Sequence, residues 1–580
     1  MMKTNLSISL ILLILVTACN PSQEAEERNS IVETTKSDAS TGGMVAAAQP
    51  LATQAGVQIL EAGGNAADAA VAAAFVIAVV EPTMNGIGGR NQIFIRQSDG
   101  SFMGYNGMTE VPASFIPDED PPNSGHRVVA IPGVVAALMR LHKEHGSMPL
   151  EVLMKPAIKH AAEGFELLDG EAKRHSLGLD AIKNDPGFRK QMLKNDTSTY
   201  QAGEILKQPD LAKTLQRIAE TNGEDFYKGE TARIIAEDMA ANDGFITTED
   251  LANYQALDAR YVSIPYRDYE IHSIPAPAGG GLVVKALNIM ENFDLSSMSD
   301  AQWAAVVNQA LAFSMESMEY DYAEEDLDQV QSKDWAKEKA AQIIIPEAND
   351  NKEAAELTRD QQLLATNTDW SGNTWGEQSH HTTHFVTADC SGMVVSITQT
   401  IGPLFGSKVI TPGLGFVYAS TMGAYLSGSD QAPGSRPRTT IAPTIVTKDG
   451  ETVMVLGAAG GLRILSGIVQ TISRYVDQGM TLEEAVSAPR IHPETDYNDG
   501  NRVVFPTKFS AEFTPTNGWS AEDSIYWQNQ GFEIGAITRY GAFSRVHAIA
   551  RDPETNMWTG MADLDWEGTA SGAEENACVE

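Results

Sequence analysis

The sequence is poor in cysteine and in basic residues. Its 580 residues include three cysteines, which are too few for a disulfide framework. The 41 basic and 77 acidic side chains give a net charge of −36 at pH 7, so the chain lacks the positive charge that attracts nucleic acids and anionic lipids. Neither a nucleic-acid partner nor electrostatic adsorption to a membrane is therefore expected.

Long hydrophobic runs are also scarce beyond the N-terminus. The next most apolar stretch, residues 66–80, contains Asp68, ends at Glu81-Pro82 and is too short to cross a bilayer. Its richness in alanine, with Asn65 as a capping residue, predicts a helix buried in a globular domain. Hydrophobic residues make up 42% and charged residues 20% of the chain, which is the balance of an ordinary folded protein.

The first residues have the features of a secretory signal. Lys3 precedes an apolar run over residues 10–16, and small residues come directly before Cys19. Residues 16–19, Val-Thr-Ala-Cys, resemble the lipobox of bacterial lipoproteins, whose cysteine becomes the lipidated N-terminus. We expect residues 1–19 to be a lipoprotein signal peptide with lipidation at Cys19. A plain secretory signal with a coincidental cysteine is the alternative.

The polar, acidic residues 20–42 are typical of a flexible tether. One acylated cysteine would then anchor a soluble body to a membrane, on the periplasmic side of a bacterial cell envelope. Asn20 stands where an acidic residue would signal retention at the inner membrane, so the outer membrane is favoured. The lipid anchor is the only membrane contact expected.

Two threonines fall at corresponding places in a predicted hairpin. Residues 382–387 and 393–400 read as strands joined by a turn near residues 389–392. With the turn centred near Ser391, Thr400 lies opposite Thr382, within the uncertainty of a one-residue bulge. The preceding residues 346–381 are polar, with little apolar periodicity, and are predicted to be an exposed loop or a segment of low order.

This placement permits a specific chemistry at Thr382. If the backbone were cut before Thr382, its new α-amino group would have a pKa of about 7.7–8.0 and could serve as a base for its own hydroxyl. Thr400 could hydrogen-bond the amine or the hydroxyl. Facing threonines are ordinary in sheets, so the pattern by itself is a weak signal for this chemistry and favours a structural role.

A glycine turn lies further along the chain. A predicted strand over residues 452–457 is followed by Ala458-Ala459-Gly460-Gly461 and by a predicted helix from about residue 464. Backbone N–H groups at such a turn suit an oxyanion hole or a phosphate cradle. The phosphate alternative lacks both G-x-G-x-x-G and a P-loop lysine, and a tight turn that merely needs glycine is a third interpretation.

Several short motifs occur in one order along most of the chain. They include Gly63-Gly64-Asn65-Ala66-Ala67-Asp68-Ala69, Gly86-Ile87-Gly88-Gly89, Thr382-Thr383-His384-Phe385, Pro443-Thr444-Ile445-Val446, Gly460-Gly461-Leu462-Arg463-Ile464 and Ala488-Pro489-Arg490-Ile491-His492. Together they resemble the γ-glutamyltranspeptidases, a family of N-terminal-nucleophile hydrolases. The resemblance implies an α+β fold, a four-layer αββα sandwich, made as one precursor that cleaves itself.

The same resemblance implies subunits and site residues. Cleavage between His381 and Thr382 would give a large-subunit region, 43–381, that ends in a mobile polar loop, and a small-subunit region, 382–580. Thr382 matches the nucleophile and Thr400 the threonine that supports it. The residues that match the carboxylate-contacting hydroxyls are Thr439 and Thr440, and those that match the oxyanion-hole glycines are Gly460 and Gly461. The expected partners are a small-molecule amide or peptide substrate and the two subunits themselves, with no cofactor.

Several positions that bind the γ-glutamyl group in the family have other residues in this sequence. Met108 stands where an arginine binds the substrate carboxylate, and Gly402 stands where an asparagine is usual. The stretch that holds the substrate ammonium in the family reads Ala-Ser-Thr-Met-Gly-Ala over residues 419–424, in which Thr421 is a candidate substrate contact. Arg90 or Arg438 could supply a substitute positive charge. We therefore expect an amide hydrolase or acyltransferase with an altered acyl pocket, acting on γ-glutamyl or related amides.

A metal site and a binding function without catalysis are two further interpretations of the sequence. His380, His381 and His384 invite a metal site, but no helix nearby completes a ligand set, so no metal is expected. The alternative function is a surface binding protein that keeps the fold without turnover. Retention of Thr382 and Thr400 argues against that alternative.

Overall fold

A computed structural model describes residues 35–316, 326–347, 380–426, 431–498, 501–513, 518–537 and 543–575. These residues belong to one compact unit, Thr35–Glu580. The signal peptide, Cys19, most of the tether, residues 348–379 of the polar segment and Cys578 lie outside the described residues, so the expectations for them stay predictions.

Within the described residues, the strands form two seven-stranded antiparallel sheets. The first sheet has the order β1 (Ser37–Ser40), β18 (Trp558–Ala562), β17 (Arg545–Arg551), β13 (Glu451–Ala459), β12 (Thr444–Lys448), β9 (Tyr269–Ser273) and β8 (Val262–Tyr266). The second has the order β19 (Thr569–Gly572), β2 (Gly43–Ala47), β10 (His380–Asp389), β11 (Val394–Pro403), β3 (Arg90–Arg96), β4 (Phe102–Gly107) and β7 (Leu257–Asp258).

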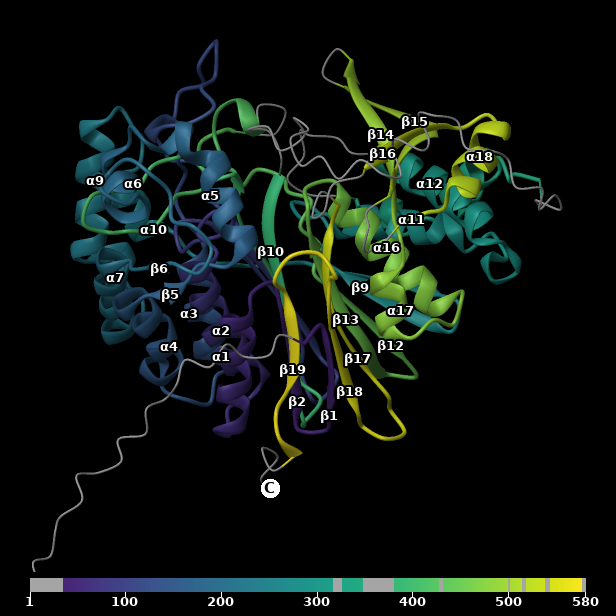
Figure 1. Cartoon of the computed structure of the whole chain (residues 1–580), viewed down its shortest axis with the longest axis horizontal. Helices are drawn as coiled ribbons and strands as arrows, with labels where there is room; N and C mark the ends of the chain where they lie inside the picture. Colours follow the sequence, from purple (N-terminus) through teal and green to yellow (C-terminus); the bar gives the residue numbers. More distant parts are fainter. Residues whose placement is uncertain are drawn as a thin grey trace, which may run out of the picture. The chain divides into compact units, whose positions relative to one another are not determined.

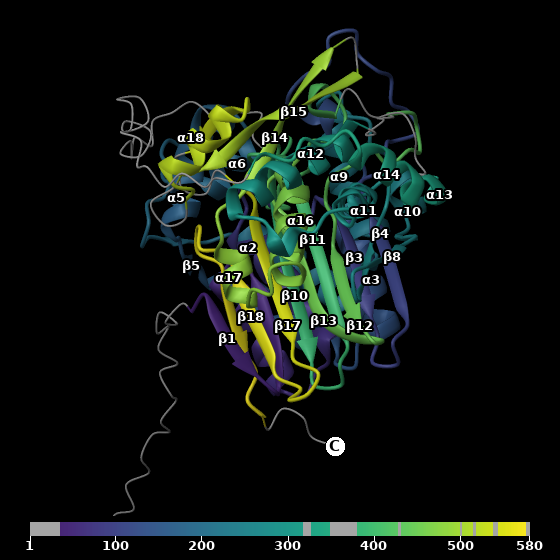
Figure 2. The same cartoon turned by 90° about the vertical axis from the view of Figure 1, so that its right-hand side faces the viewer.

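Helices cover the outer face of each sheet (Figures 1 and 2). Against the second sheet lie α1 (Pro50–Glu61), α2 (Ala66–Val80), α3 (Val134–His145), α4 (Leu150–Glu163), α5 (Asp169–Ile182), α6 (Pro186–Met192), α7 (Pro209–Thr221), α8 (Glu224–Lys228), α9 (Glu230–Ala241) and α10 (Thr248–Asn253). Against the first lie α11 (Gly280–Met290), α12 (Asp300–Glu316), α13 (Leu327–Val330), α14 (Lys333–Ala340), α16 (Arg463–Val476) and α17 (Leu482–Ser487). The expected four-layer αββα sandwich is confirmed.

Alternation along the strands explains this layering. In β10, Phe385 packs into the cluster under the helices, whereas Val386 packs into the cluster between the two sheets. Successive side chains of a strand point to opposite faces, so both faces of this central strand are buried. Asn65 caps the start of α2, as the sequence predicts, and Asp68 completes a capping box with it.

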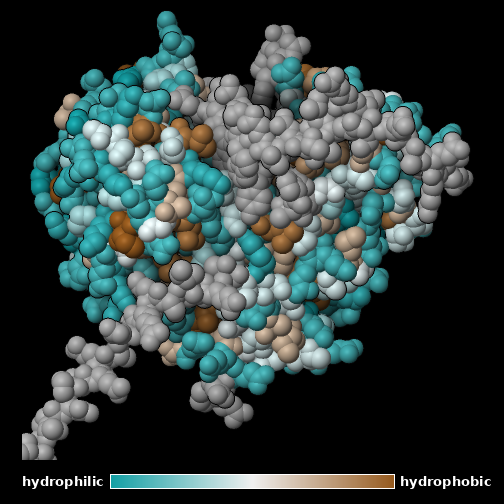
Figure 3. Space-filling view, in the orientation of Figure 1, coloured by the Kyte–Doolittle hydropathy of each residue, from teal (hydrophilic) through white to brown (hydrophobic). Residues whose placement is uncertain are grey.

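Smaller elements complete the described part of the chain. A three-stranded sheet contains β14 (Ile491–Asn498), β15 (Asn501–Glu512) and β16 (Glu533–Ile537), with α18 (Ala521–Asn529) beside it. A two-stranded sheet contains β5 (Phe165–Glu166) and β6 (Ile205–Leu206). None of the helices in the described residues is long and apolar enough to cross a membrane. The face shown in Figure 3 is mostly hydrophilic, with separate small hydrophobic patches.

From the sequence, the folded body was expected to begin at residue 43. In the structure it begins earlier. Ser37–Ser40 form β1, which pairs with β18 at the edge of the first sheet. The Lys36 ammonium donates hydrogen bonds to the carbonyl oxygens of Asp563 and Trp566, at 2.9 and 2.7 Å. An edge strand has one side open to solvent, so polar residues can form one. A polar composition alone therefore does not distinguish an edge strand from a flexible tether.

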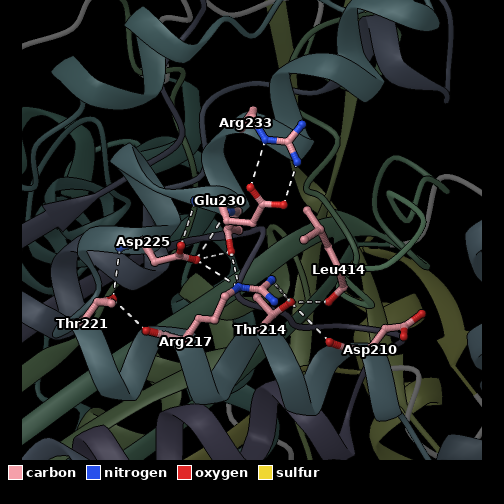
Figure 4. Close-up of polar contacts among 9 residues, drawn as sticks. Asp210, Thr214, Arg217, Thr221, Asp225, Glu230, Arg233 and Leu414 are labelled. Carbon is pink, nitrogen blue, oxygen red and sulfur yellow. Dashed lines mark hydrogen bonds and ion pairs between the residues drawn. The ribbon is translucent and has the colours of Figure 1, made fainter.

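Contacts join the parts of the chain before and after Thr382. Strand β2 pairs with β10 over five residues. Farther out, the Thr214 hydroxyl on α7 donates to the Leu414 carbonyl oxygen at 2.9 Å (Figure 4). The two regions predicted from the sequence are therefore parts of one core.

The predicted hairpin of β10 and β11 has the expected register from Thr383, which pairs with Gln399, to Ala388, which pairs with Val394. Between His381 and Thr383 the register shifts by one residue. Thr382 therefore sits in a bulge, where the regular ladder is interrupted. The strand itself begins at His380, two residues earlier than predicted.

Candidate active site

Thr382 and Thr400 lie side by side and buried at the bulge. The Thr382 hydroxyl donates a hydrogen bond to Thr400 Oγ1 at 3.2 Å, and the Thr400 hydroxyl donates to the His381 carbonyl oxygen at 2.7 Å. The Gly402 N–H also donates to Thr400 Oγ1, at 2.9 Å. The peptide bond before Thr382 thus has the Thr382 hydroxyl on one side, and its carbonyl oxygen accepts a hydrogen bond from the Thr400 hydroxyl.

An arginine from the facing sheet contacts the backbone of Thr382. Arg545 Nη2 donates to the Thr382 carbonyl oxygen at 2.9 Å, and its Nη1 lies 3.3 Å from Glu81 Oε1. Both side chains are almost completely buried. The sequence analysis identified neither contact: it names Glu81 only as the end of an apolar stretch, and it does not name Arg545.

A buried ion-pair network extends from Glu81. Arg174 Nη2 lies 3.6 Å from Glu81 Oε1 and 2.6 Å from Glu171 Oε2. Burial raises the pKa of Glu81, against the opposing charges of Arg545 and Arg174. Burial also acts to raise the pKa of Glu171, but the Arg174 charge and hydrogen bonds from His175 and Thr83 outweigh it and bring that pKa to about 2. Glu171 is thus ionised at neutral pH and fixes Arg174.

The glycine turn lies next to Arg545. Ala459, the last residue of β13, pairs with Arg545 of β17, and Gly460-Gly461 follow directly. Their φ angles are +134° and +63°, in the region that favours glycine, and a Cβ on Gly460 would lie 3.0 Å from Ser544 Cα. The turn therefore directly follows the residue that pairs with Arg545, and the Arg545 side chain contacts Thr382.

The predicted pair Thr439 and Thr440 reaches the same turn. The Thr440 hydroxyl donates to the Gly461 carbonyl oxygen at 2.9 Å. Thr439 Oγ1 accepts from the Ile441 N–H at 3.3 Å. Arg438 is buried and directly precedes them. These residues hold the loop beside the glycine turn, and Arg438 stays a candidate from the sequence.

Arg90 and Thr421, two other candidates, are in direct contact. Arg90 Nη1 donates to Thr421 Oγ1 and to the Ser420 carbonyl oxygen, both at 3.1 Å. Thr421 Oγ1 also lies 2.9 Å from Thr109 Oγ1, a partner that the sequence reasoning did not identify. Met108, beside Thr109, is fully buried in an apolar cluster. Met108 stands where the family has its carboxylate-binding arginine. The loop that contains Met108 and Thr109 therefore contacts Arg90 through Thr421.

His384 does not contribute a positive charge to the site. Burial lowers the pKa of His384 to about 3, and its Nδ1 lies 2.9 Å from Thr398 Oγ1. His384 is therefore neutral at physiological pH. Among the residues that the structure describes, no group of three His, Cys, Asp or Glu side chains is placed to hold a metal ion. Cys390, in the hairpin turn, is an exposed thiol.

Known proteins resemble this chain over most of its length. A family profile described as gamma-glutamyltranspeptidase matches residues 52–573. A glutathione hydrolase proenzyme of Escherichia coli is 33% identical over 484 residues, covering 78% of this chain and 80% of the relative. An acylase ACY 1 proenzyme of Pseudomonas sp. is 34% identical over 476 residues, covering 78% and 82%. The crystal structure of cephalosporin acylase from Bacillus halodurans aligns with a TM-score of 0.79 and 28% identity, covering 97% of this chain and all of that one.

Proposed function

Because the chain belongs to the γ-glutamyltranspeptidase family of N-terminal-nucleophile hydrolases, we propose that it is a self-processing amide hydrolase or acyltransferase whose nucleophile is Thr382. The family resemblance inferred from the motifs is confirmed, and with it an enzyme acting on amide bonds. The roles of individual residues are our proposal. The observation that carries it is the hydrogen-bonded chain from Thr382 through Thr400 to the His381 carbonyl.

Self-cleavage follows from this chain of hydroxyls. Thr382 Oγ attacks the His381 carbonyl carbon while its proton passes to Thr400 Oγ, and the Thr400 proton passes to the carbonyl oxygen. Collapse of the tetrahedral intermediate breaks the C–N bond and leaves an ester on Thr382 Oγ, with the proton returned to the new amine. Water then hydrolyses the ester. The bulge at Thr382 supports this step because the nucleophile is already outside the regular ladder.

The cleaved enzyme then acts on external amides. The Thr382 α-amine, with a pKa of about 7.7–8.0, accepts the hydroxyl proton as Oγ attacks the amide carbonyl. We assign the backbone N–H groups around Gly460 and Gly461 to stabilising the oxyanion. Arg545 keeps Thr382 in place through its carbonyl oxygen. The amine leaves with a proton, and the acyl group passes from Thr382 to water or to another amine.

The acyl pocket is proposed to differ from that of a γ-glutamyl enzyme. Met108 is apolar and buried, Gly402 has no side chain, and Gly423 and Ala424 stand where the family holds the substrate ammonium. Losing one hydrogen bond to a charged group costs roughly 1.5–3 kcal/mol, so several losses weaken γ-glutamyl binding strongly. Relatives of about equal identity are named a glutathione hydrolase and an acylase, which is consistent with a substrate outside the γ-glutamyl class.

Processing of the full chain tests this function. We expect a fragment with the N-terminal sequence Thr-Thr-His-Phe, detected by gel electrophoresis and Edman sequencing, and its disappearance in Thr382→Ala. Thr382→Ser should retain cleavage because it retains a hydroxyl. The control is Thr387→Val, which changes a threonine of the same strand that bonds Ala66 on the helix side. A single uncleaved band from the unmutated chain would instead favour the binding-protein alternative.

We also propose that the protein is exported and held at the cell envelope by a lipid on Cys19. The support is the signal-like N-terminus and the lipobox-like residues 16–19. Labelling cells with radioactive palmitate should mark the protein, and the label should be lost in Cys19→Ser. Cys390→Ser is the matched control because this exposed thiol is far from the signal in sequence. Label that persists in Cys19→Ser would contradict the anchor.

A further inference from the structure

Arg545 brings a positive charge to the proposed nucleophile from the opposite sheet. It is the first residue of β17, which packs against β10 of the facing sheet (Figure 2). Its Nη2 donates a hydrogen bond to the Thr382 carbonyl oxygen at 2.9 Å. Three covalent bonds separate that oxygen from the Thr382 nitrogen, so Nη2 lies within about 7 Å of this nitrogen. The proposed cut breaks the bond before the nitrogen and therefore leaves the Arg545 contact intact.

Burial strengthens the effect of this charge on the amine that cleavage would create. Thr382 and Arg545 are both 5% exposed, and charges in such an interior are screened less than in water. Arginine stays charged in proteins. A protonated amine beside a guanidinium is a pair of like charges, which disfavours the protonated form. Arg545 therefore acts to lower the pKa of the Thr382 amine below its ordinary range of about 7.7–8.0.

Glu81 is the carboxyl that opposes Arg545. Its Oε1 accepts a hydrogen bond from Arg545 Nη1 at 3.3 Å and lies 3.6 Å from Arg174 Nη2. Burial raises the pKa of Glu81, whereas the two guanidinium groups act against burial and favour the carboxylate. The Thr383 hydroxyl, on the residue after Thr382, also acts to lower the pKa of this carboxyl. A carboxylate here favours a protonated amine, so Glu81 acts to raise the amine pKa that Arg545 lowers.

The histidines on the two facing strands add no charge to this pair. His384 lies two residues after Thr382 on β10, and burial lowers its pKa to about 3. His547 lies two residues after Arg545 on β17, and burial lowers its pKa well below the ordinary value. Both imidazoles are therefore neutral at the pH at which an α-amine titrates.

The other charged groups around the pair have partners of their own or lie farther away. Arg174 pairs with Glu171 at 2.6 Å, and the Lys36 ammonium donates to the Asp563 carbonyl oxygen at 2.9 Å. The Asp563 carboxylate in turn pairs with an arginine at 2.8 Å. Arg90 belongs to β3, which β11 separates from β10. Arg545 and Glu81 are thus the two opposing charges that contact residues 382 and 383.

We propose that the Glu81–Arg545 pair sets the proton affinity of the Thr382 α-amine in the cleaved enzyme, with Arg545 favouring the free amine and Glu81 favouring the protonated amine. Neither side chain contacts the reacting atoms, so both are positioning residues that act through their charges and the Thr382 backbone. Their balance keeps the amine available as the base for its own hydroxyl at neutral pH. This inference rests on the proposed function, because the amine exists only after cleavage before Thr382.

The proton affinity of this amine is measurable without a substrate. The cleaved enzyme is treated with trace acetic anhydride over a range of pH, esters are removed with hydroxylamine, and mass spectrometry follows acetylation of the peptide that begins at Thr382. Only the free amine reacts, so the midpoint of the acetylation rate against pH is the pKa of the amine. In the unmutated enzyme this midpoint should lie below the ordinary range of about 7.7–8.0. A midpoint within or above that range would overturn the proposal.

Substitutions of the two partners should move the midpoint in opposite directions. Arg545→Gln removes the nearer positive charge and should raise the midpoint by at least about one pH unit. Glu81→Gln keeps an oxygen for Arg545 but removes the negative charge, and should lower the midpoint by at least about half a unit. Arg545→Lys keeps the charge and should stay within about half a unit of the parent. An unchanged midpoint in either Gln variant, or shifts of both in one direction, would show a structural role and overturn the proposal.

The matched control is Arg551→Gln. Arg551 lies at the other end of β17 and pairs with Glu451 at 3.4 Å, so the same substitution breaks an ion pair on the same strand. Its midpoint should equal that of the parent. A shift as large as that of Arg545→Gln would mean that net charge, and not the position of Arg545, sets the proton affinity. If Arg545→Gln does not fold, the unmutated enzyme and Glu81→Gln decide the matter.

Failure of the proposed function gives a different result. In that case the unmutated chain yields no Thr382-terminal fragment on a gel, and this inference fails with the proposed function. A fragment whose acetylation midpoint does not respond to Arg545→Gln and Glu81→Gln overturns this inference alone. The proposed function then stands, because cleavage before Thr382 has been observed.

Discussion

Two buried arginines, Arg90 and Arg174, have opposite surroundings. Both side chains have an exposed fraction of about 2% or less. Arg174 lies between two carboxylates, at 2.6 Å from Glu171 and 3.6 Å from Glu81, whereas Arg90 has a hydroxyl and a carbonyl as its partners. The difference teaches that burial alone does not tell whether the described part of the chain supplies an arginine with a counter-charge.

This contrast has opposite consequences for stability. Removing one member of a buried ion pair leaves the other charge uncompensated in a low-dielectric interior, which is strongly destabilising. Removing a buried charge that has no partner relieves a cost instead. Measurements in the Thr382→Ala background compare the two sites in a chain that is expected to stay in one piece.

Glu171→Gln is expected to have the largest effect. The variant leaves the Arg174 guanidinium without its nearest carboxylate, so the free energy of unfolding should fall by about 3–5 kcal/mol. Urea denaturation measures this change. Glu163→Gln, at an exposed site on α4, controls for the chemical substitution. A loss below about 1 kcal/mol would mean that Arg174 does not need its partner, and the contrast with Arg90 would fail.

The pH dependence of stability should sharpen the same contrast. Folding lowers the pKa of Glu171 from 4.5 to about 2. Such a carboxyl contributes stability that is complete above its unfolded pKa and is lost as the pH falls through the folded pKa. Between about pH 4.5 and 2, the parent should lose of the order of 3 kcal/mol that Glu171→Gln does not lose. Parallel profiles of the two proteins in thermal denaturation would contradict this assignment.

Arg90→Met should change stability in the opposite direction, and less. Replacing an uncompensated buried charge with an apolar side chain of similar length should leave the free energy of unfolding unchanged or raise it by about 1 kcal/mol. Urea denaturation beside Glu171→Gln gives the comparison directly. A loss of about 3 kcal/mol or more would show that Arg90 has a structural role like that of Arg174.

The smallest effect is expected at an exposed arginine. Arg233 on α9 pairs with Glu230 at 2.6 Å (Figure 4), and both side chains are about half exposed. Exposed pairs of this kind contribute little because solvent screens them. Arg233→Gln should therefore leave the melting temperature unchanged within error in a thermal scan. A clear drop would show that exposure is a poor guide to the worth of an ion pair in this protein.

The sequence predicted the elements whose signals are local. The Asn65 cap of α2, the glycine turn before α16 and the register of the β10–β11 hairpin from Thr383 onward were all found as expected. The bulge that contains Thr382 fell within the one-residue uncertainty of the predicted register. The start of the folded body was placed too late because β1 is a polar edge strand held by Lys36.

The residues missed from the site are those with distant partners. Arg545 contacts Thr382 across 163 positions of the chain and Glu81 across 464. No periodicity or spacing connects residues so far apart. Arg90 was a candidate from the sequence, but nothing in the sequence distinguished it from Arg438, the other arginine named as a possible substitute for the lost positive charge.

By itself, the sequence determined the family and, through that resemblance, the layered fold, and it led to Thr382 as the proposed nucleophile. The resemblance rests on short motifs, which are properties of neighbouring residues. Only the tertiary structure decided which charges are paired. Compensation of a buried charge depends on what the fold brings within a few ångströms of it, and that is why Arg174 has its carboxylates whereas Arg90 has none among the residues that the structure describes.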